Sequence, residues 1–405
     1  MKYVVFLGDG MADEKIEALG NKTPLDISVK PIIDKYSKKG VIGLVSTVPE
    51  KFSPGSDVAN LSVLGYDPHK YYTGRSPLEA ASIGVELENN ETAFRANVVT
   101  LSGSGEYSNL IMEDYSADEI KTEDAKILIE DFAKMINNEK TALYAGISYR
   151  HLLVLRDKNL KGDLTPPHDI SKKPIKDYLP KDEEILDLMK KSYEFFKTHP
   201  YNIKRIAEGK KPASSIWVWG QGKKPQIDSF SSKFGIKNGA VISAVDLIKG
   251  IGILAKLDSI EVEGATGTIH TNFEGKAQAA VSALKNGCDF LYIHMEAPDE
   301  CGHHFEIENK IKAIEYIDGR VVKTVMEYLE NCGEDFAILV LPDHPTPVET
   351  GTHSREAVPF FAYSNKFLNV GDVYNEDNAS KSGLHIEVGH ELMSKFIDLS
   401  LFGCL

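Results

Sequence analysis

The strongest constraint on the fold is the alternation of strand-like and helix-like segments near both ends of the chain. Short apolar runs typical of buried strands cover Tyr3–Leu7 and Phe336–Leu341. A segment from Ile307 to Tyr328 precedes the second run and has apolar residues at helical spacing. Such alternation favours a mostly parallel sheet with helices on both faces. We therefore predict the α/β class, with a three-layer domain.

The middle of the chain has a different pattern. It contains short strand-like segments, an acidic helical segment at residues 122–135 and a stretch rich in proline and lysine at 164–181. A chain of 405 residues is also longer than a single hydrophobic core usually supports. We predict a smaller inserted α+β domain at residues 88–180, within a discontinuous α/β domain formed by 1–87 and 181–405.

Composition restricts the possible partners. The formal net charge of −14 argues against a protein that coats nucleic acid, because binding to phosphates needs clustered cations. We find no stretch approaching the ~20 consecutive apolar residues of a membrane span. The four cysteines form no C-x-x-C pair, and the N-terminus has the pattern of a first strand and not of a signal peptide. These features predict a cytoplasmic protein with no nucleic-acid or membrane partner. We expect a small-molecule partner, and the oligomeric state stays open between a monomer and a small homo-oligomer.

Aspartates and histidines follow several of the expected strands. In open α/β sheets, functional side chains gather just beyond the carboxyl ends of the strands. Carboxylate oxygens combined with imidazole nitrogens suit Zn, Mn or Fe better than Ca or Mg. Each residue alone is more often a cap, a turn or a surface group, but the set favours a metal site. The residues are Asp9, Asp299, His303, Asp343, His344 and His353.

Ser56 is the candidate nucleophile. It lies in Pro54-Gly55-Ser56-Asp57, directly before an apolar segment that includes Val58, Leu61 and Leu64. One interpretation makes Ser56 or Asp57 a helix N-cap, the commonest use of such residues. The other places the Ser56 hydroxyl at a helix N-terminus, where exposed N–H groups favour an alkoxide and a phosphate. The two interpretations are compatible.

The order of these residues resembles the metal-site order of the alkaline phosphatase superfamily: Asp, Ser, Asp-x-x-x-His, Asp-His and a last His. Longer stretches resemble the archaeal-type branch of the 2,3-bisphosphoglycerate-independent phosphoglycerate mutases, and together they span essentially the whole chain. These stretches are residues 8–13, 55–61, 65–68, 73–80, 219–222, 296–303 and 342–347.

The resemblance implies an alkaline-phosphatase-like domain with an inserted substrate-binding domain. It also implies two divalent metal ions (Mn, Zn or Co) and no bisphosphoglycerate cofactor. One ion would be held by Asp9, Ser56, Asp343 and His344, and the other by Asp299, His303 and His353. The expected reaction interconverts 2-phosphoglycerate and 3-phosphoglycerate through a phosphoserine on Ser56.

Substrate contacts are expected mainly in the predicted insert. Arg75, Arg95 and Arg150 could bind phosphate or carboxylate groups bidentately, although arginines also form surface salt bridges. His168 and Asp169 could move protons between glycerate hydroxyls, although a rigid turn explains the same residues. Because water would hydrolyse a phosphoserine, we expect the insert to act as a lid, with hinges near 85–90 and 178–185.

Other functions use the same set of residues. A metal-dependent phosphatase or another phosphotransferase is the first alternative, including homoserine-kinase-like or phosphonopyruvate-related activity. We find no glycine-rich nucleotide loop, which a kinase would need. A non-catalytic metal-binding relative is the second alternative, but every expected ligand and the nucleophile are present in the sequence.

Overall fold

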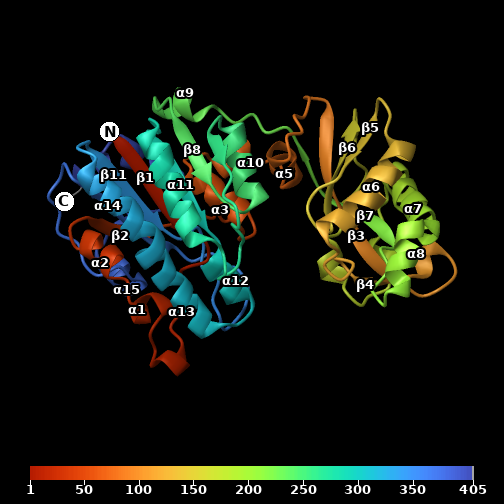
Figure 1. The fold of residues 1–405 in the computed structure, drawn as a ribbon, viewed down its shortest axis with the longest axis horizontal. Helices are drawn as coiled ribbons and strands as arrows, with labels where there is room; N and C mark the ends of the chain where they lie inside the picture. Colours follow the sequence, from red (N-terminus) through yellow and green to blue (C-terminus); the bar gives the residue numbers. More distant parts are fainter. Residues whose placement is uncertain (404–405) are drawn as a thin grey trace. The chain divides into compact units, whose positions relative to one another are not determined.

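The computed structural model describes residues 1–403, which fall into two compact units (Figure 1). The larger unit comprises Met1–Tyr72 and the chain from Gln226 onward, and the smaller unit is Thr73–Pro225. Within residues 1–403, no helix is both long enough and apolar enough to cross a membrane.

The larger unit is built on an eight-stranded, mostly parallel sheet in the order β13-β2-β12-β11-β1-β10-β8-β9, which confirms the predicted α/β class. Its strands are β1 (Lys2–Gly8), β2 (Val41–Val45), β8 (Gly239–Ile242), β9 (Asp258–Ile260), β10 (Phe290–Met295), β11 (Phe336–Leu341), β12 (Val358–Ser364) and β13 (His385–Ile386).

Three parallel strands at the centre of this sheet position the candidate site. Strand β1 pairs with β10 on one side and with β11 on the other, both in parallel. All three strands are buried almost throughout, which explains their near-continuous apolar sequences. Because the strands are parallel neighbours, the loops that follow them leave the sheet at the same edge.

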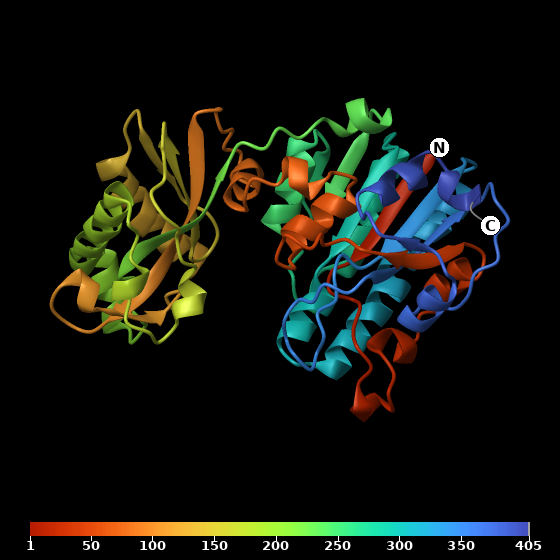
Figure 2. The same ribbon diagram turned by 180° about the vertical axis from the view of Figure 1, so that it is seen from behind.

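Helices cover both faces of the sheet in the larger unit. Helices α11, α13 and α14 cover one face (Figure 1), and α3 and α16 lie on the other (Figure 2). The helices are α1 (Pro24–Ile27), α2 (Pro31–Ser37), α3 (Ser56–Val63), α4 (Pro68–Tyr71), α9 (Phe230–Phe234), α10 (Asp246–Leu254), α11 (Phe273–Lys285), α12 (Ala297–His303), α13 (Ile307–Tyr316), α14 (Lys323–Asn331), α15 (Glu376–Lys381) and α16 (Glu391–Ile397).

The predicted helix from Ile307 to Tyr328 is present, but a π-helical segment, Ile317–Val322, interrupts it. The widened turn directs the buried carboxylate of Asp318 toward the first turn of α2. Its Oδ1 accepts a hydrogen bond from the backbone N–H of Ile33 at 2.6 Å. The interruption therefore places an anion where a helix N-terminus has unpaired N–H groups.

The smaller unit is an antiparallel sheet with helices on both faces. Helices α6, α7 and α8 pack on one face and α5 on the other. The strands are β3 (Glu91–Ser102), β4 (Ile111–Asp114), β5 (Thr141–Tyr144), β6 (Arg150–Arg156) and β7 (Ser215–Lys223). The helices are α5 (Ser76–Ser82), α6 (Thr122–Ile136), α7 (Glu183–Thr198) and α8 (Pro200–Ala207).

This unit is longer than the predicted segment 88–180 at both ends. The late strand β7 pairs with β3 and not with the large sheet, which brings α7, α8 and β7 into the smaller unit. Helix α5 also packs on this sheet, so Arg75 lies here and not in the α/β domain. The predicted hinge ranges 85–90 and 178–185 therefore lie inside the smaller unit.

Three of the four cysteines lie within residues 1–403. Cys288, Cys301 and Cys332 are free thiols, and the first two are buried. Cys404 lies outside the described residues.

Candidate metal centre and nucleophile

Loops after three neighbouring strands bring the six predicted ligands together. Asp9 follows β1, helix α12 after β10 carries Asp299 and His303, and the loop after β11 begins with Asp343 and His344. His353 lies later in the same loop, before β12, and its imidazole stacks on that of His344 with ring centroids 4.0 Å apart. The convergence follows from the parallel pairing of the strands.

Asp9, Asp343 and His344 form the first group, and all three are buried. His344 Nε2 lies 3.6 Å from Asp9 Oδ1 and 3.4 Å from Asp343 Oδ2. Burial raises the pKa of Asp9 well above its ordinary value, and the negative charges of Asp343 and Asp299 add to this. Asp9 Oδ1 is buried without a hydrogen-bond partner among the described residues. The group therefore has an excess of negative charge that a cation would neutralise.

Asp299, His344 and His353 form the second group, so His344 belongs to both. His303 lies at the same place, because its Nε2 is 2.9 Å from His353 Nε2 and 3.2 Å from Asp299 Oδ2. Burial opposes ionisation of Asp299, but hydrogen bonds from His303 and His353 outweigh burial and hold its pKa well below its ordinary value. The neighbouring His304 is exposed, which favours His303 as the ligand.

Ser56 is the first residue of α3, and Gly55 is the N-cap. No side chain caps this helix, so the Ser56 hydroxyl is not used in capping. Instead, its Oγ lies 3.2 Å from His344 Nε2. Of the two interpretations of Ser56, the structure therefore favours the one in which its oxygen faces the ligand cluster.

Several residues that support the ligands escaped the sequence analysis. Asn60 lies one helical turn after Ser56, and its Nδ2 donates to Asp343 Oδ2 at 2.8 Å and to the Ser56 carbonyl at 2.8 Å. Tyr292 in β10 donates to Asn60 Oδ1 at 2.6 Å. Thr346 donates to Asp299 Oδ1 at 2.5 Å. The spacing of four between Ser56 and Asn60 was a usable signal, because it places both on one helix face.

His294 is a further missed residue. It is the only ionisable side chain within the apolar strand β10 besides Tyr292, and it is completely buried. Burial lowers its pKa to about 3, so the ring is uncharged at neutral pH. A histidine in an apolar strand, directly before a candidate ligand helix, was the signal available in the sequence.

The predicted substrate residues all lie in the smaller unit. Arg95 in β3 faces Trp219 in β7 across the antiparallel pair, and its guanidinium lies 4.8 Å from the centre of the indole ring. Asn97 is opposite Arg150 in β6, so Arg150 shares a sheet face with Arg95. Glu79 in α5 contacts Arg95 Nε at 3.0 Å and Arg75 Nε at 3.4 Å.

The three arginines and His168 also interact electrostatically. Burial lowers the pKa of Arg95 to about 10, and the positive charges of Arg75 and Arg150 act in the same direction. His168 packs edge-on against Trp219, with ring centroids 5.3 Å apart. Its pKa is lowered by burial and by the positive charges of Arg95 and Arg75. This group of cations is suited to bind an anion that carries more than one charged group.

Asp169 has fewer contacts with the group formed by the arginines and His168. Its Oδ1 lies 3.5 Å from His168 Nε2, and more than half of its side chain is exposed. The structure therefore brings His168 together with the arginines and leaves Asp169 at the edge of that group.

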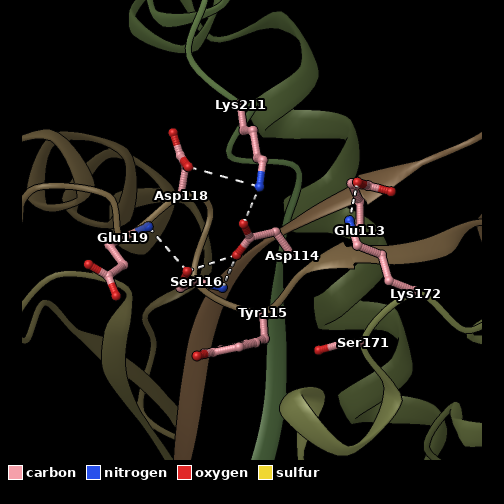
Figure 3. Close-up of a pocket in the computed structure, with 9 residues that line it drawn as sticks. All are labelled: Glu113, Asp114, Tyr115, Ser116, Asp118, Glu119, Ser171, Lys172 and Lys211. Carbon is pink, nitrogen blue, oxygen red and sulfur yellow. Dashed lines mark hydrogen bonds and ion pairs between the residues drawn. The ribbon is translucent and has the colours of Figure 1, made fainter. Parts of the chain in front are cut away.

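A separate pocket of the smaller unit has a volume of about 470 Å³ and is lined by carboxylates and lysines (Figure 3). Asp114 accepts hydrogen bonds from Lys211 at 2.6 Å and from the Ser116 hydroxyl at 2.7 Å. Glu113 forms an ion pair with Lys172. These charges are paired within the pocket wall, and none of the predicted site residues lines it.

Comparison with known proteins identifies the family. A family model described as 2,3-bisphosphoglycerate-independent phosphoglycerate mutase matches residues 37–202. A relative from Geobacter sulfurreducens, named as a probable enzyme of this kind, is 49% identical over 98% of this chain and 100% of its own. The enzyme of that name from Methanosarcina barkeri is 48% identical over 97% of this chain and 98% of its own.

A solved structure from Pyrococcus horikoshii has a TM-score of 0.80 at 28% identity, covering 98% of this chain and 97% of that one. The cofactor-independent phosphoglycerate mutase of Thermoplasma acidophilum has a TM-score of 0.67 at 24% identity, covering 99% and 100% of the two chains, and shares the fold. Because curated relatives at nearly half identity match over almost their full length, this chain belongs to the family of 2,3-bisphosphoglycerate-independent phosphoglycerate mutases.

Proposed function

We propose that this protein interconverts 2-phosphoglycerate and 3-phosphoglycerate without a bisphosphate cofactor, with Ser56 as the residue that carries the phosphoryl group. The observation that carries the proposal is the position of the Ser56 hydroxyl. It lies at a helix N-terminus, takes no part in capping and faces the cluster of aspartates and histidines. The names of the relatives support the same reaction.

The residues of the cluster fit two divalent metal ions. The donor set combines carboxylate oxygens with imidazole nitrogens, and the buried Asp9 Oδ1 has no protein partner. We assign Asp9, Ser56, Asp343 and His344 to one ion and Asp299, His303 and His353 to the other, with Mn, Zn or Co as the candidates. When bound, such ions lower the pKa of a serine hydroxyl and neutralise charge on phosphoryl oxygens.

The reaction itself needs two transfers at Ser56. In the first, Ser56 Oγ forms a bond to phosphorus while the bond from phosphorus to the substrate oxygen breaks. In the second, the other hydroxyl of the bound glycerate attacks the phosphoserine, and the Ser56 oxygen is the leaving group. The glycerate oxygen that leaves phosphorus in the first transfer gains a proton, and the other hydroxyl loses its proton when it attacks in the second. We assign this proton exchange to His168 with Asp169.

Substrate recognition is assigned to the smaller unit. Arg75, Arg95 and Arg150 supply guanidinium groups for the phosphate and the carboxylate of phosphoglycerate, and Arg150 also stabilises charge during transfer. Because these residues and Ser56 belong to different units, the proposal requires the smaller unit to act as a lid. Single-molecule distance measurements should show the two units approaching each other when 3-phosphoglycerate is added.

A coupled assay on metal-loaded protein tests the activity. Wild-type protein should interconvert the two phosphoglycerates with little release of phosphate, whereas steady release would indicate a phosphatase. Ser56→Ala should abolish the activity and the acid-stable label from radioactive substrate, while Ser53→Ala, at an exposed serine three residues earlier, serves as the matched control. Full activity in Ser56→Ala would rule out the phosphoserine route.

A further inference from the structure

We propose that Ser243 and His294 form a buried relay that fixes the Asp9 carboxylate, so that Asp9 Oδ1 is presented to the metal centre. His294 and Ser243 are positioning residues and do not touch the substrate. The inference rests on the proposed metal centre and extends it by two side chains outside the ligand set.

Three adjacent strands supply the members of the relay. Asp9 follows β1, His294 lies in β10, and Ser243 follows β8, which pairs with β10 in parallel. His294 Nε2 lies 2.9 Å from Asp9 Oδ2. Its other nitrogen, Nδ1, lies 3.1 Å from Ser243 Oγ. All three side chains are buried.

The partners determine the direction of each hydrogen bond. Ser243 Oγ accepts the backbone N–H of Val245 at 3.0 Å, so its own hydrogen is available for His294 Nδ1. The Lys276 ammonium donates to the backbone carbonyl of His294 at 2.9 Å. The single imidazole hydrogen is then on Nε2, which donates to Asp9 Oδ2.

The relay explains why the two oxygens of Asp9 differ. Oδ2 is held by His294, whereas Oδ1 is buried with no hydrogen-bond partner among residues 1–403. A carboxylate held through one oxygen cannot rotate freely about its Cβ–Cγ bond, so Oδ1 remains directed at His344 Nε2, 3.6 Å away. Hydrogen-bond partners of this kind typically change metal affinity by about 10–100-fold when they are removed.

Two substitutions of His294 separate the relay from general packing. In His294→Gln the side-chain amide can reach the position of Nε2 and still donate to Asp9, whereas the shorter His294→Asn amide ends near the position of Nδ1. We expect His294→Asn to weaken one of two Mn²⁺ binding events by about 10–100-fold in isothermal titration calorimetry. His294→Gln should lose clearly less Mn²⁺ affinity than His294→Asn. The affinity of the other binding event should be unchanged in both variants.

His151→Asn is the matched control, because His151 is an equally buried histidine in the smaller unit. It should leave both Mn²⁺ affinities unchanged. A purely structural role of His294 would lower the melting temperature of the metal-free protein and leave Mn²⁺ affinity intact, and that result would overturn the proposal. Equal losses of Mn²⁺ affinity in His294→Asn and His294→Gln would also overturn the proposal.

If His294→Asn does not fold, Ser243→Ala decides the question. It leaves the imidazole in place but removes the partner that fixes its hydrogen, so we expect a smaller loss of Mn²⁺ affinity, about threefold. Unchanged affinity in Ser243→Ala would overturn the relay. Wild-type protein that binds no Mn²⁺ would overturn the metal centre itself, whereas normal binding in the wild type and in His294→Asn would remove only the relay.

Discussion

Replacing Lys310 by methionine tests whether one buried ion pair holds together two loops that carry candidate ligands. Lys310 lies in α13, and its Nζ donates to Asp13 Oδ2 at 2.7 Å, to the Ala12 carbonyl at 3.2 Å and to the Thr346 carbonyl at 2.8 Å. Both side chains of the Lys310–Asp13 pair are fully buried. The ammonium therefore links the loop after β1 to the loop after β11.

The structure sets the size of the expected effect. Methionine keeps most of the length of lysine but leaves the Asp13 carboxylate without its cation, although the backbone N–H of Val348 still donates to it. Leaving one partner of a buried ion pair uncompensated costs about 3–5 kcal/mol in the free energy of unfolding. With a slope of about 3 kcal/mol per molar urea, the midpoint of unfolding of the larger unit should fall by about 1–1.7 M.

Two optical signals separate the units in the assay. Both tryptophans, Trp217 and Trp219, lie in β7 of the smaller unit, so their fluorescence reports on that unit. Circular dichroism at 222 nm includes the larger unit, to which helices α1–α4 and α9–α16 contribute. Lys310→Met should shift the transition seen by circular dichroism and leave the tryptophan transition nearly unchanged.

A shift below about 0.3 M, which corresponds to less than about 1 kcal/mol at the same slope, would refute the role assigned to the Lys310–Asp13 pair. The double variant Lys310→Met with Asp13→Asn gives a second check. Because it removes both charges, it should be less destabilised than the sum of the two single variants. Simple additivity would show that the pair does not interact as the geometry indicates.

Three further predictions concern the substrate residues, the metal ions and pH. Arg95→Lys keeps the positive charge but loses the bidentate geometry, so the KM for 3-phosphoglycerate should rise about tenfold in the coupled assay, and an unchanged KM would contradict the assignment. Removal of metal with EDTA should abolish activity, and Mn²⁺ should restore it where Ca²⁺, which prefers oxygen ligands, does not. Burial raises the pKa of Glu376 to about 7, above its ordinary value, so ionisation of Glu376 weakens the folded state as pH rises from about 4.5 to 7. The melting temperature of Glu376→Gln minus that of the wild type should therefore increase from pH 5 to pH 8. A difference that stays constant over this range would contradict the prediction.

The large sheet and the grouping of the candidate ligands at its edge were largely predictable, because both depend on local sequence. An apolar run such as Phe336–Leu341 identifies a buried strand, and parallel pairing then places the residues after each strand at one edge. The positions of Asp9 and Asp343 could be predicted from this information alone. His353 was harder, since only its loop and not a strand end positions it.

The boundary of the smaller unit was not predictable in the same way. Strand β7 has the same apolar character as the strands of the large sheet, and nothing in its own sequence tells which sheet it joins. Its pairing with β3 spans more than a hundred residues of chain and is fixed by the core in which Trp217 of β7 lies together with Phe94 of β3. Arg75 was assigned to the wrong unit for the same reason, because the position of α5 depends on that sheet.

The candidate residues of the larger unit depend on local sequence, whereas those of the smaller unit depend on the pairing of strands that are distant in the chain. The candidate ligands and Ser56 come from segments that each follow a strand of the large sheet or begin α3, so short motifs suffice to predict a metal-dependent phosphoryl-transfer site. Arg95 and Arg150 share a face only because β3 and β6 pair in one register, and a shift of one residue would turn either arginine to the opposite face. Under the proposed function, the choice between water and a glycerate hydroxyl as acceptor depends on these arginines, and therefore on the pairing of strands within the smaller unit. This is why the metal motifs alone left the phosphatase and mutase alternatives open, and why variants of Arg95 discriminate between them better than variants of the metal ligands.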